Sequence, residues 1–266
     1  MSRFPDQQYL MTDQYRDSSN LEARLVIHQR FSTNPYGWFN WVFDRLVQLP
    51  ENVNILELGC GSGILWKECA SRIPTGWVVT LSDLSDGMLD AAWRNLATVG
   101  RTFKLEQIDA QFIPYEDGKF DAVIANHMLY HIPDRQKALF EIKRVLKENG
   151  RLIATTVGDN HMKEVNAWLR RVTIEKDRVQ FSQLFTLENG LCQLEEFFSK
   201  VEISRYLDGL KVAEIEPLMA YIRSAIHSAD LSLAELAKIE VELTAFLECE
   251  GKIPITKDSG LFEAVK

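Results

Sequence analysis

Short apolar runs and amphipathic stretches alternate through the middle of the chain. Apolar runs typical of buried strands lie at about residues 54–58, 77–83, 103–107, 120–125 and 151–156. Stretches with apolar residues at helical spacing separate them at about 64–70, 86–99 and 134–147. Ser85 is placed to cap the second of these helices, and Asn149-Gly150 to end the third. The alternation predicts an α/β fold in which a parallel sheet carries helices on both faces.

The segment before this region predicts two further helices, at about residues 20–30 and 38–49. In the second one we expect Trp41 and Val42 to join the core, because they recur at helical spacing with other apolar residues. Phe31, Tyr36 and Trp38 lie nearer the intervening loop and are candidates to wall a substrate pocket.

The regular alternation stops after Thr156. The region 157–198 looks mostly helical, and Asp208-Gly209 reads as a turn between strands at about 201–206 and 210–213. Two helices at about 216–228 and 231–250 and a final strand within 253–265 complete the chain. The apolar positions expected near one face of the long helix are Leu233, Leu236, Leu243 and Leu247.

The bulk composition is that of an ordinary globular protein. With 266 residues, 46% hydrophobic and 26% charged, the chain suits one α/β domain and excludes a disordered or collagen-like class. It contains no apolar run of about 18 residues and no apolar stretch at its start, so we expect neither a membrane span nor a signal peptide. The cysteines Cys60, Cys69, Cys192 and Cys249 form no CxxC pair, so we expect a reducing cytoplasm and no metal site. The net charge of −8 argues against nucleic acid as the main partner.

The central motif is a glycine-rich loop, Gly59-Cys60-Gly61-Ser62-Gly63, between a predicted strand and a predicted helix. Such a loop lets a ligand approach bare backbone at the end of a strand, where open α/β sheets bind their ligands. A dinucleotide-binding loop needs a small residue where this chain has Ile64. Glu57, two residues before the loop, would also repel a pyrophosphate. A cationic ligand without phosphates, such as S-adenosylmethionine (SAM), suits the loop better.

Two more carboxylates follow the next predicted strands. Asp83 closes the second strand, about 20 residues after the loop, where an acid accepts hydrogen bonds from ribose hydroxyls. Asp109 follows the third strand, where a carboxylate can accept a hydrogen bond from an adenine amino group. Three acids at successive strand ends, together with the glycine loop, predict a nucleoside-containing cofactor.

At residues 53–157 the chain resembles the class I SAM-dependent methyltransferases, in the small-molecule branch that includes ubiquinone/menaquinone-type enzymes. The segments ILELGCGSG, TLSDLSDGML, IDAQFIPYEDGKFDAVIANHMLYHIPD and VLKENGRLIATT carry the resemblance. It implies a Rossmann-like seven-stranded sheet with an antiparallel last strand. It also implies an N-terminal helical lid over residues 1–45, a SAM-binding core over 46–157, and a helical substrate lid with completion of the sheet over 158–266, all in one compact domain.

The resemblance also implies roles for particular residues. The loop glycines and Cys60 would pass beneath the methionine part of SAM, with Glu57 near its ammonium and Asn126 beside its sulfonium. Asp83 would hold the ribose and Asp109 the adenine, while Tyr15 would fold over the cofactor from the lid. The expected cofactor-binding set is Glu57, Gly59, Cys60, Gly61, Gly63, Asp83, Leu84, Met88, Asp109, Ala110 and Asn126.

His131 and His127 flank the expected methyl-transfer site and are the catalytic candidates, because an imidazole titrates near neutral pH. The alternative is structural, since strings such as Tyr130-His131-Ile132-Pro133 occur in the family across unrelated substrates. His28 and His161 could reach the pocket from the lids.

The expected function is methyl transfer from SAM, which becomes S-adenosylhomocysteine, to a small-molecule acceptor. A nucleic-acid or protein methyltransferase is a second hypothesis. Against it, Asn126-His127-Met128-Leu129 lacks the Asn/Asp-Pro-Pro-aromatic motif, and no basic stripe is evident. A SAM-binding protein that does not methylate is a third, because a fold alone does not fix a function. The acceptor and the oligomeric state do not follow from the sequence.

Overall fold

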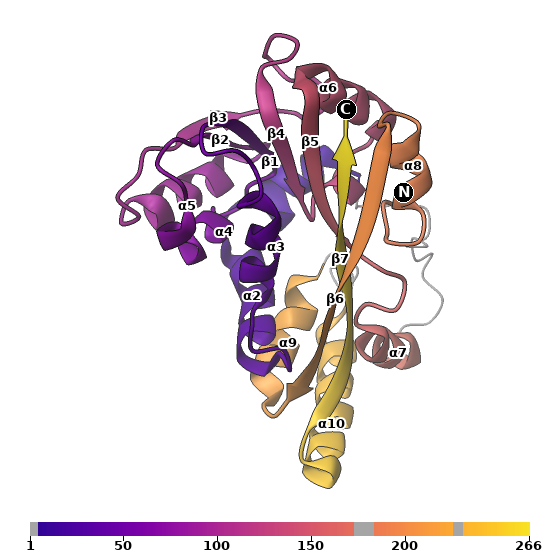
Figure 1. Ribbon diagram of the computed structural model, residues 1–266. Coiled ribbons are helices and arrows are strands. Elements are labelled where there is room, and N and C mark those ends of the chain that lie inside the picture. The colour runs from indigo at the N-terminus through magenta and orange to yellow at the C-terminus, as the bar shows by residue number, and fades with distance from the viewer. Residues whose placement is uncertain (1–4, 173–183, 226–230) are drawn as a thin grey trace.

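The computed structural model describes residues 5–172, 184–225 and 231–266. Within these residues seven strands form one sheet in the order β3-β2-β1-β4-β5-β7-β6 (Figure 1). Neighbours from β3 to β5 pair in parallel, whereas β7 is antiparallel to both β5 and β6. The predicted fold class is therefore confirmed, including the antiparallel last strand. The strands are β1 Asn54–Leu58, β2 Val78–Asp83, β3 Lys104–Gln107, β4 Phe120–Asn126, β5 Leu146–Val157, β6 Lys200–Val212 and β7 Ile253–Val265.

Helices cover both faces of the sheet and also gather at its far end (Figure 1). The α-helices are α1 Gln7–Tyr9, α2 Ser19–Phe31, α3 Trp38–Leu46, α4 Ile64–Glu68, α5 Asp86–Leu96, α6 Arg135–Val145, α7 Lys163–Val172, α8 Gly190–Glu195, α9 Ile215–Ser224 and α10 Leu233–Glu250. A π-helical turn η1 (Leu10–Gln14) and 3-10 turns η2 (Ala70–Arg72) and η3 (Leu129–His131) complete the list.

The central strand β1 shows why the sheet needs cover on both sides. Successive side chains of a strand point to opposite faces of the sheet, so a strand that is apolar at consecutive positions must be covered on both faces. Ile55 joins the core under α3, α4 and α5, whereas Leu56 and Leu58 join the core under α6 and α8. All three are almost fully buried. The floor of the site is therefore held rigidly from both faces.

A third core lies where β6 and β7 extend beyond the other strands. Ile27 of α2 packs there with residues of α7, α9, α10 and the strand pair. In Figure 1 the long β6–β7 pair reaches down to α9 and α10, with α2 beside α9. This arrangement places α2 across the carboxyl ends of the parallel strands, where the site lies.

Most predicted elements are present, but two expectations are wrong. Helix α6 ends at Val145 and not at Asn149-Gly150, because Leu146 already pairs with Phe120 as the start of β5 and is fully buried. Asn149 does adopt a left-handed backbone, φ +62°, but inside the irregular first part of β5.

Asp208-Gly209 is not a turn. Strand β6 continues through both residues, with Asp208 opposite Lys257 of β7. The aspartate is retained inside a strand because its side chain is fully buried and paired with that lysine.

The four leucines expected near one face of the long helix differ in burial, and Leu236, Leu243 and Leu247 contact the third core. Leu233 is 86% exposed at the start of α10, whereas Ile239 and Leu243 are fully buried. Apolar spacing alone did not reveal which turns of the helix are covered by a neighbour.

Candidate active site

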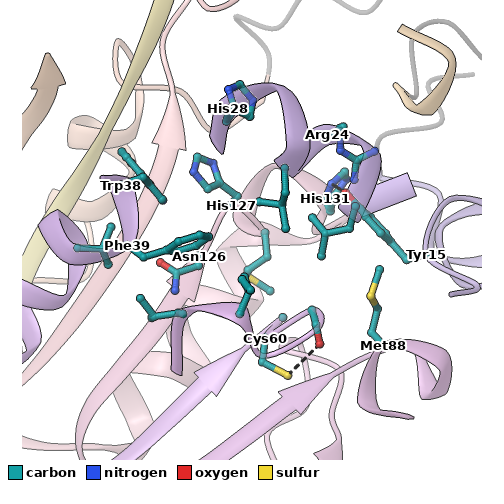
Figure 2. Close-up of a pocket in the computed structure, with 18 of the residues that line it drawn as sticks. Tyr15, Arg24, His28, Trp38, Phe39, Cys60, Met88, Asn126, His127 and His131 are labelled. Atoms are coloured by element: carbon teal, nitrogen blue, oxygen red, sulfur yellow. Dashed lines mark hydrogen bonds between the residues drawn. The ribbon is translucent and has the colours of Figure 1, made fainter. Parts of the chain in front are cut away.

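A cavity of about 650 Å³ opens where the carboxyl ends of β1, β2 and β4 meet α2. Its floor is the glycine loop after β1, and its roof comes from α2 and η1 (Figure 2). Of the sequence-predicted site residues, the following line it: Glu57, Gly59, Cys60, Gly61, Asp83, Leu84, Met88, Asp109, Ala110, Asn126, His127 and His131.

The glycine loop brings bare backbone to the cavity. Gly59 and Gly61 have φ of +66° and +54°, which side chains other than glycine rarely adopt. A Cβ on Gly59 would lie 2.8 Å from the Cβ of Met128. Gly63 is the one predicted loop glycine that does not line the cavity, because it turns the chain into α4 against Leu96.

Asp83 ties the end of β2 to this loop. One carboxylate oxygen accepts a hydrogen bond from the Gly61 backbone N–H at 2.9 Å, and the other accepts one from Ser85 at 2.9 Å. Burial raises the pKa of Asp83, and these backbone hydrogen bonds counteract the shift. A carboxylate oriented by these two hydrogen bonds still has lone pairs that can accept hydrogen bonds from ligand hydroxyls.

Asp109 lies at the opposite end of the floor. Its carboxylate accepts hydrogen bonds from the Gln111 backbone N–H at 2.9 Å and from the Gln7 side chain at 3.1 Å. Gln7 belongs to α1, so the N-terminal segment reaches the region expected to take adenine.

Glu57 is buried beneath the loop and begins a chain of hydrogen bonds. Its carboxylate accepts from the indole of Trp66 and, at 2.8 Å, from the side-chain amide of Asn126. The side-chain oxygen of Asn126 accepts a hydrogen bond from the Thr155 hydroxyl at 3.3 Å. The same hydroxyl accepts a hydrogen bond from the backbone N–H of His127. Burial raises the pKa of Glu57 to about 7, although the two hydrogen bonds favour its ionised form.

The role of Cys60 in the loop depends on its small side chain and not on a reactive thiol. Burial and the nearby Asp83 and Glu57 raise the pKa of its thiol well above the ordinary value, so the thiol stays protonated. A protonated, enclosed thiol is a poor nucleophile.

The N-terminal segment closes over one side of the cavity. The hydroxyl of Tyr15 lies 3.0 Å from Nε2 of His131, and their rings meet edge to face. The Tyr15 carbonyl accepts a hydrogen bond from Ser85, at the start of α5. Gly87 permits this approach, since a Cβ there would lie 1.9 Å from the carbonyl oxygen of Arg16.

Three further imidazoles border the cavity from three different elements. His28 comes from α2, His127 follows β4 and His161 follows β5 (Figure 2 shows the first two). The rings of His28 and His161 are 6.1 Å apart, and His28 meets Tyr221 edge to face. Among the residues described, no three His, Cys, Asp or Glu side chains are arranged to hold a metal ion.

These imidazoles are neutral near pH 7. Burial and the charge of Lys257 lower the pKa of His127 to about 4, and burial lowers that of His161 to about 3. Burial also lowers the pKa of His28 well below its usual value. The Asp258 backbone N–H donates to Nδ1 of His161, so the proton of that neutral ring is on Nε2.

A buried ion pair holds the roof to the strand pair. Lys257 Nζ lies 2.6 Å from the Asp208 carboxylate, and their side chains are 7% and 0% exposed. Asp208 also accepts hydrogen bonds from Ser32 and from the backbone N–H groups of Thr33 and Asn34. The loop between α2 and α3 is thereby fixed beside the cavity.

The sequence analysis missed Arg24, Tyr221, Lys257 and Ser259, which line the cavity. One signal was available: the residues of α2 that line the cavity recur at intervals of three and four. They are Leu21, Arg24, Leu25, His28 and Gln29, and Ser32 at the C-cap continues the pattern. Of the predicted pocket-wall aromatics, Trp38 lines the cavity and packs against His127, with ring centroids 5.3 Å apart. Phe31 joins the third core and Tyr36 is 50% exposed, so neither lines it.

Comparisons with known proteins agree with this geometry. Residues 56–154 match a family model described as a methyltransferase domain. A malonyl-[acyl-carrier protein] O-methyltransferase of Legionella pneumophila is 37% identical over 134 residues, which is 48% of this chain and 45% of the relative. A demethylmenaquinone methyltransferase of Lactobacillus johnsonii is 34% identical over 119 residues, 44% of this chain and 48% of the relative. The chain thus spans about half the length of these relatives.

Solved structures share the fold. A phosphoethanolamine N-methyltransferase 2 of Haemonchus contortus, in complex with SAM, has a TM-score of 0.61 at 20% identity, covering 100% of this chain and 60% of that one. A putative methyltransferase from Bacillus halodurans has a TM-score of 0.58 at 17% identity, covering 86% and 98%. Residues 56–154 thus match a methyltransferase domain, and the chain shares the fold of solved methyltransferases.

Proposed function

We propose that the protein transfers a methyl group from SAM to a small-molecule acceptor bound in the same cavity. The observation that carries this proposal is the continuity of the cavity, which joins the glycine loop and its three carboxylates to an aromatic-lined space under α2. SAM, when bound, supplies an activated methyl group on a sulfonium. The protein has to hold SAM and the acceptor in line for methyl transfer and to exclude water. Alignment and exclusion of water can account for much of the rate enhancement.

The cavity fits this cofactor in shape and charge. Its volume is in the range of small-molecule sites. The left-handed glycines leave a cradle that a Cβ would fill, and the acids of the floor suit a ligand with an ammonium and a sulfonium. We assign Glu57 and Asn126 to the methionine end, Asp83 to the ribose, and Asp109 and Ala110 to the adenine. The remaining proposed contacts are Gly59, Cys60, Gly61, Leu84 and Met88, while Gly63 acts through the shape of the loop.

His131 and His127 take different roles in this proposal. His127 has a pKa of about 4, which makes it a weak proton acceptor and suits it to hydrogen-bond the acceptor. Its ring is fixed by Trp38 and its backbone by Thr155. His131 bonds Tyr15, so its first task is to hold the N-terminal segment closed; it takes a proton where the acceptor must lose one.

The two flanking regions act as lids. Residues 1–45 supply α2 and the Tyr15 contact, and residues 158–266 supply His161, Tyr221 and Lys257. Relatives named for malonyl-[acyl-carrier protein], demethylmenaquinone and sterol substrates support a small-molecule acceptor or acceptor group. No helix among the described residues is both long and apolar enough to span a membrane. Four free cysteines support our proposal of a cytoplasmic location.

Calorimetric titration with SAM and S-adenosylhomocysteine tests the cofactor assignment. We expect wild type to bind both and Asp83→Ala to lose most of the affinity, because the ribose contact and the loop anchor disappear together. Asp90→Ala, an exposed acid on α5, is the matched control and should bind like wild type. Folded wild type that binds neither ligand would refute the proposal. S-adenosylhomocysteine release with pooled acceptors then tests turnover.

A further inference from the structure

We propose that the acceptor carries an anionic oxygen group, a carboxylate or a phosphate, and that the guanidinium of Arg24 binds it. This inference rests on the proposed function and specifies the acceptor. Arg24 lies on the cavity face of α2, one turn before His28. Figure 2 shows its side chain beside Tyr15 and His131, over the side of the cavity away from the glycine loop.

Most of the hydrogen-bonding capacity of Arg24 is unused. A guanidinium has five N–H donors in a planar fork. Within the described part of the chain, Arg24 donates a hydrogen bond from Nη1 to the Ser224 carbonyl at 2.7 Å and also interacts with the Tyr15 hydroxyl, and it has no ion pair with an acid. Most of its five N–H donors therefore remain available for a contact with a carboxylate or phosphate.

The fork is also held in place before any ligand binds. The Ser224 carbonyl fixes one end, and the guanidinium lies over the Tyr15 ring at 5.4 Å from its centroid. Stacking on an aromatic face leaves the edge of the guanidinium free for hydrogen bonds. Because the side chain is already ordered, an anion that binds it incurs little further loss of side-chain entropy.

Charge is divided between the two sides of the cavity. The acids that line it, Glu57, Glu68, Asp83 and Asp109, all come from the sheet side. In the described residues, α2 and β7 contribute Arg24, His28 and Lys257 to the lining and no carboxylate. A cationic cofactor on the acidic floor and an anionic group under α2 would each meet the opposite charge. An acceptor whose only charge is an ammonium would meet the positive charge of Arg24 instead, because the charge of Lys257 is already paired with Asp208.

The neutral groups around Arg24 suit the rest of such an acceptor. They form an apolar and aromatic wall made of Leu21, Leu25, Trp38, Tyr130 and Tyr221. His28 lines the same space, and its Nδ1 is buried without a hydrogen-bond partner among the residues described. The acceptor we infer is thus an anion with an apolar body.

Four probes of equal chain length test this inference: octanoate, octyl phosphate, octanol and octylamine. Each is titrated by calorimetry into protein saturated with S-adenosylhomocysteine, so that the floor of the cavity is filled first. We expect at least one of the two anions to bind about tenfold or more tighter than octanol, as a charge-assisted hydrogen bond would give. The comparison of octanoate with octyl phosphate distinguishes a carboxylate from a phosphate ligand.

Two substitutions connect the preference to Arg24. Arg24→Gln keeps the length of the side chain and should reduce the anion-to-octanol ratio to near one, while Arg24→Lys should retain part of it. Arg30→Gln is the matched control on the same helix, because Arg30 pairs with Glu214 at the surface, and it should keep the full ratio. A ratio, unlike an affinity, does not change when a variant merely loosens the N-terminal segment.

Two results would overturn the inference: equal affinity for all four probes, including no binding of any, or a ratio unchanged by Arg24→Gln. The failure of the proposed function is a separate result, since it appears as a lack of S-adenosylhomocysteine binding before any probe is added. In that case the probes are titrated into the protein alone, and the ratio still reports on Arg24.

Discussion

Replacing Asp208 by Asn should destabilise the whole protein, because it leaves Lys257 buried without a counter-charge. The two side chains are 0% and 7% exposed, and their charged atoms lie 2.6 Å apart. Removing one partner of such a pair typically costs about 3–5 kcal/mol. A second limit on this destabilisation comes from Lys257, which becomes neutral if it loses its proton in the folded protein. Moving its pKa from about 10.4 to 7 corresponds to about 4.6 kcal/mol, in the same range.

Thermal and urea unfolding measure this cost. At about 2–4 °C per kcal/mol for a chain of this size, Asp208→Asn should lower Tm by about 6–20 °C. Its stability should then recover as pH rises from 7 towards 10, because the unfolded state keeps the lysine proton longer than the folded state does. The double variant Asp208→Leu/Lys257→Met, which removes both charges, should be far closer to wild type than either single change.

The wild type should show a pH dependence of the same sign, but in the acid range. Burial alone would raise the pKa of Asp208, but hydrogen bonds from Lys257 and Ser32 outweigh it and hold the pKa below the ordinary value. The stability that this carboxylate contributes is therefore complete above about pH 4 and is lost as pH falls through its lowered pKa. Arg223→Gln, which breaks an exposed pair with Glu216, is the control and should cost at most about 1 kcal/mol. An Asp208→Asn protein within 1 kcal/mol of wild type at pH 7 would refute the reasoning.

Three further predictions concern the cavity. Glu57 has a pKa raised to about 7, so folding stability without ligand should fall as pH rises from about 4.5 to 7, and Glu57→Gln should remove this slope in urea unfolding at several pH values. Gly59→Ala should reduce the affinity for S-adenosylhomocysteine at least about tenfold, as measured by calorimetry. The reason is that the new Cβ would lie 2.8 Å from Met128 on a left-handed backbone, and an unchanged affinity would show that the loop can shift. Gly87→Ala should detach the N-terminal segment, because the new Cβ would lie 1.9 Å from the Arg16 carbonyl oxygen. We expect faster proteolytic cleavage before α2 with an unchanged Tm, and cleavage at the wild-type rate would contradict the prediction.

Local patterns predicted the core of the fold because its elements are defined by short stretches of chain. Apolar runs indicated β1, β2 and β4, and Ser85 caps α5 as expected, accepting a hydrogen bond from the Met88 N–H. The floor of the cavity was equally accessible to prediction. Loop residues and acids at the ends of parallel strands must converge at one edge of the sheet, so Asp83 and Asp109 were found without coordinates.

Errors arose where a distant partner changed the meaning of a residue. Asp208-Gly209 has the composition of a turn, yet it stays in β6 because Lys257 and the α2–α3 loop satisfy the carboxylate. Leu233 follows the apolar spacing of α10, yet its side chain is 86% exposed. Neither outcome is encoded within a few residues of the position concerned.

The sequence by itself determined the α/β class, the glycine loop and the acidic floor, because backbone conformation and strand-end position depend on local sequence and on continuous apolar runs. Only the tertiary structure decided what faces that floor. Lys257 is far in sequence from Arg24 and His28 of α2, and the three meet over the cavity because β6 and β7 extend past the sheet and hold α2 across the strand ends. The acceptor side of the site therefore depends on long-range packing, which a single sequence does not reveal.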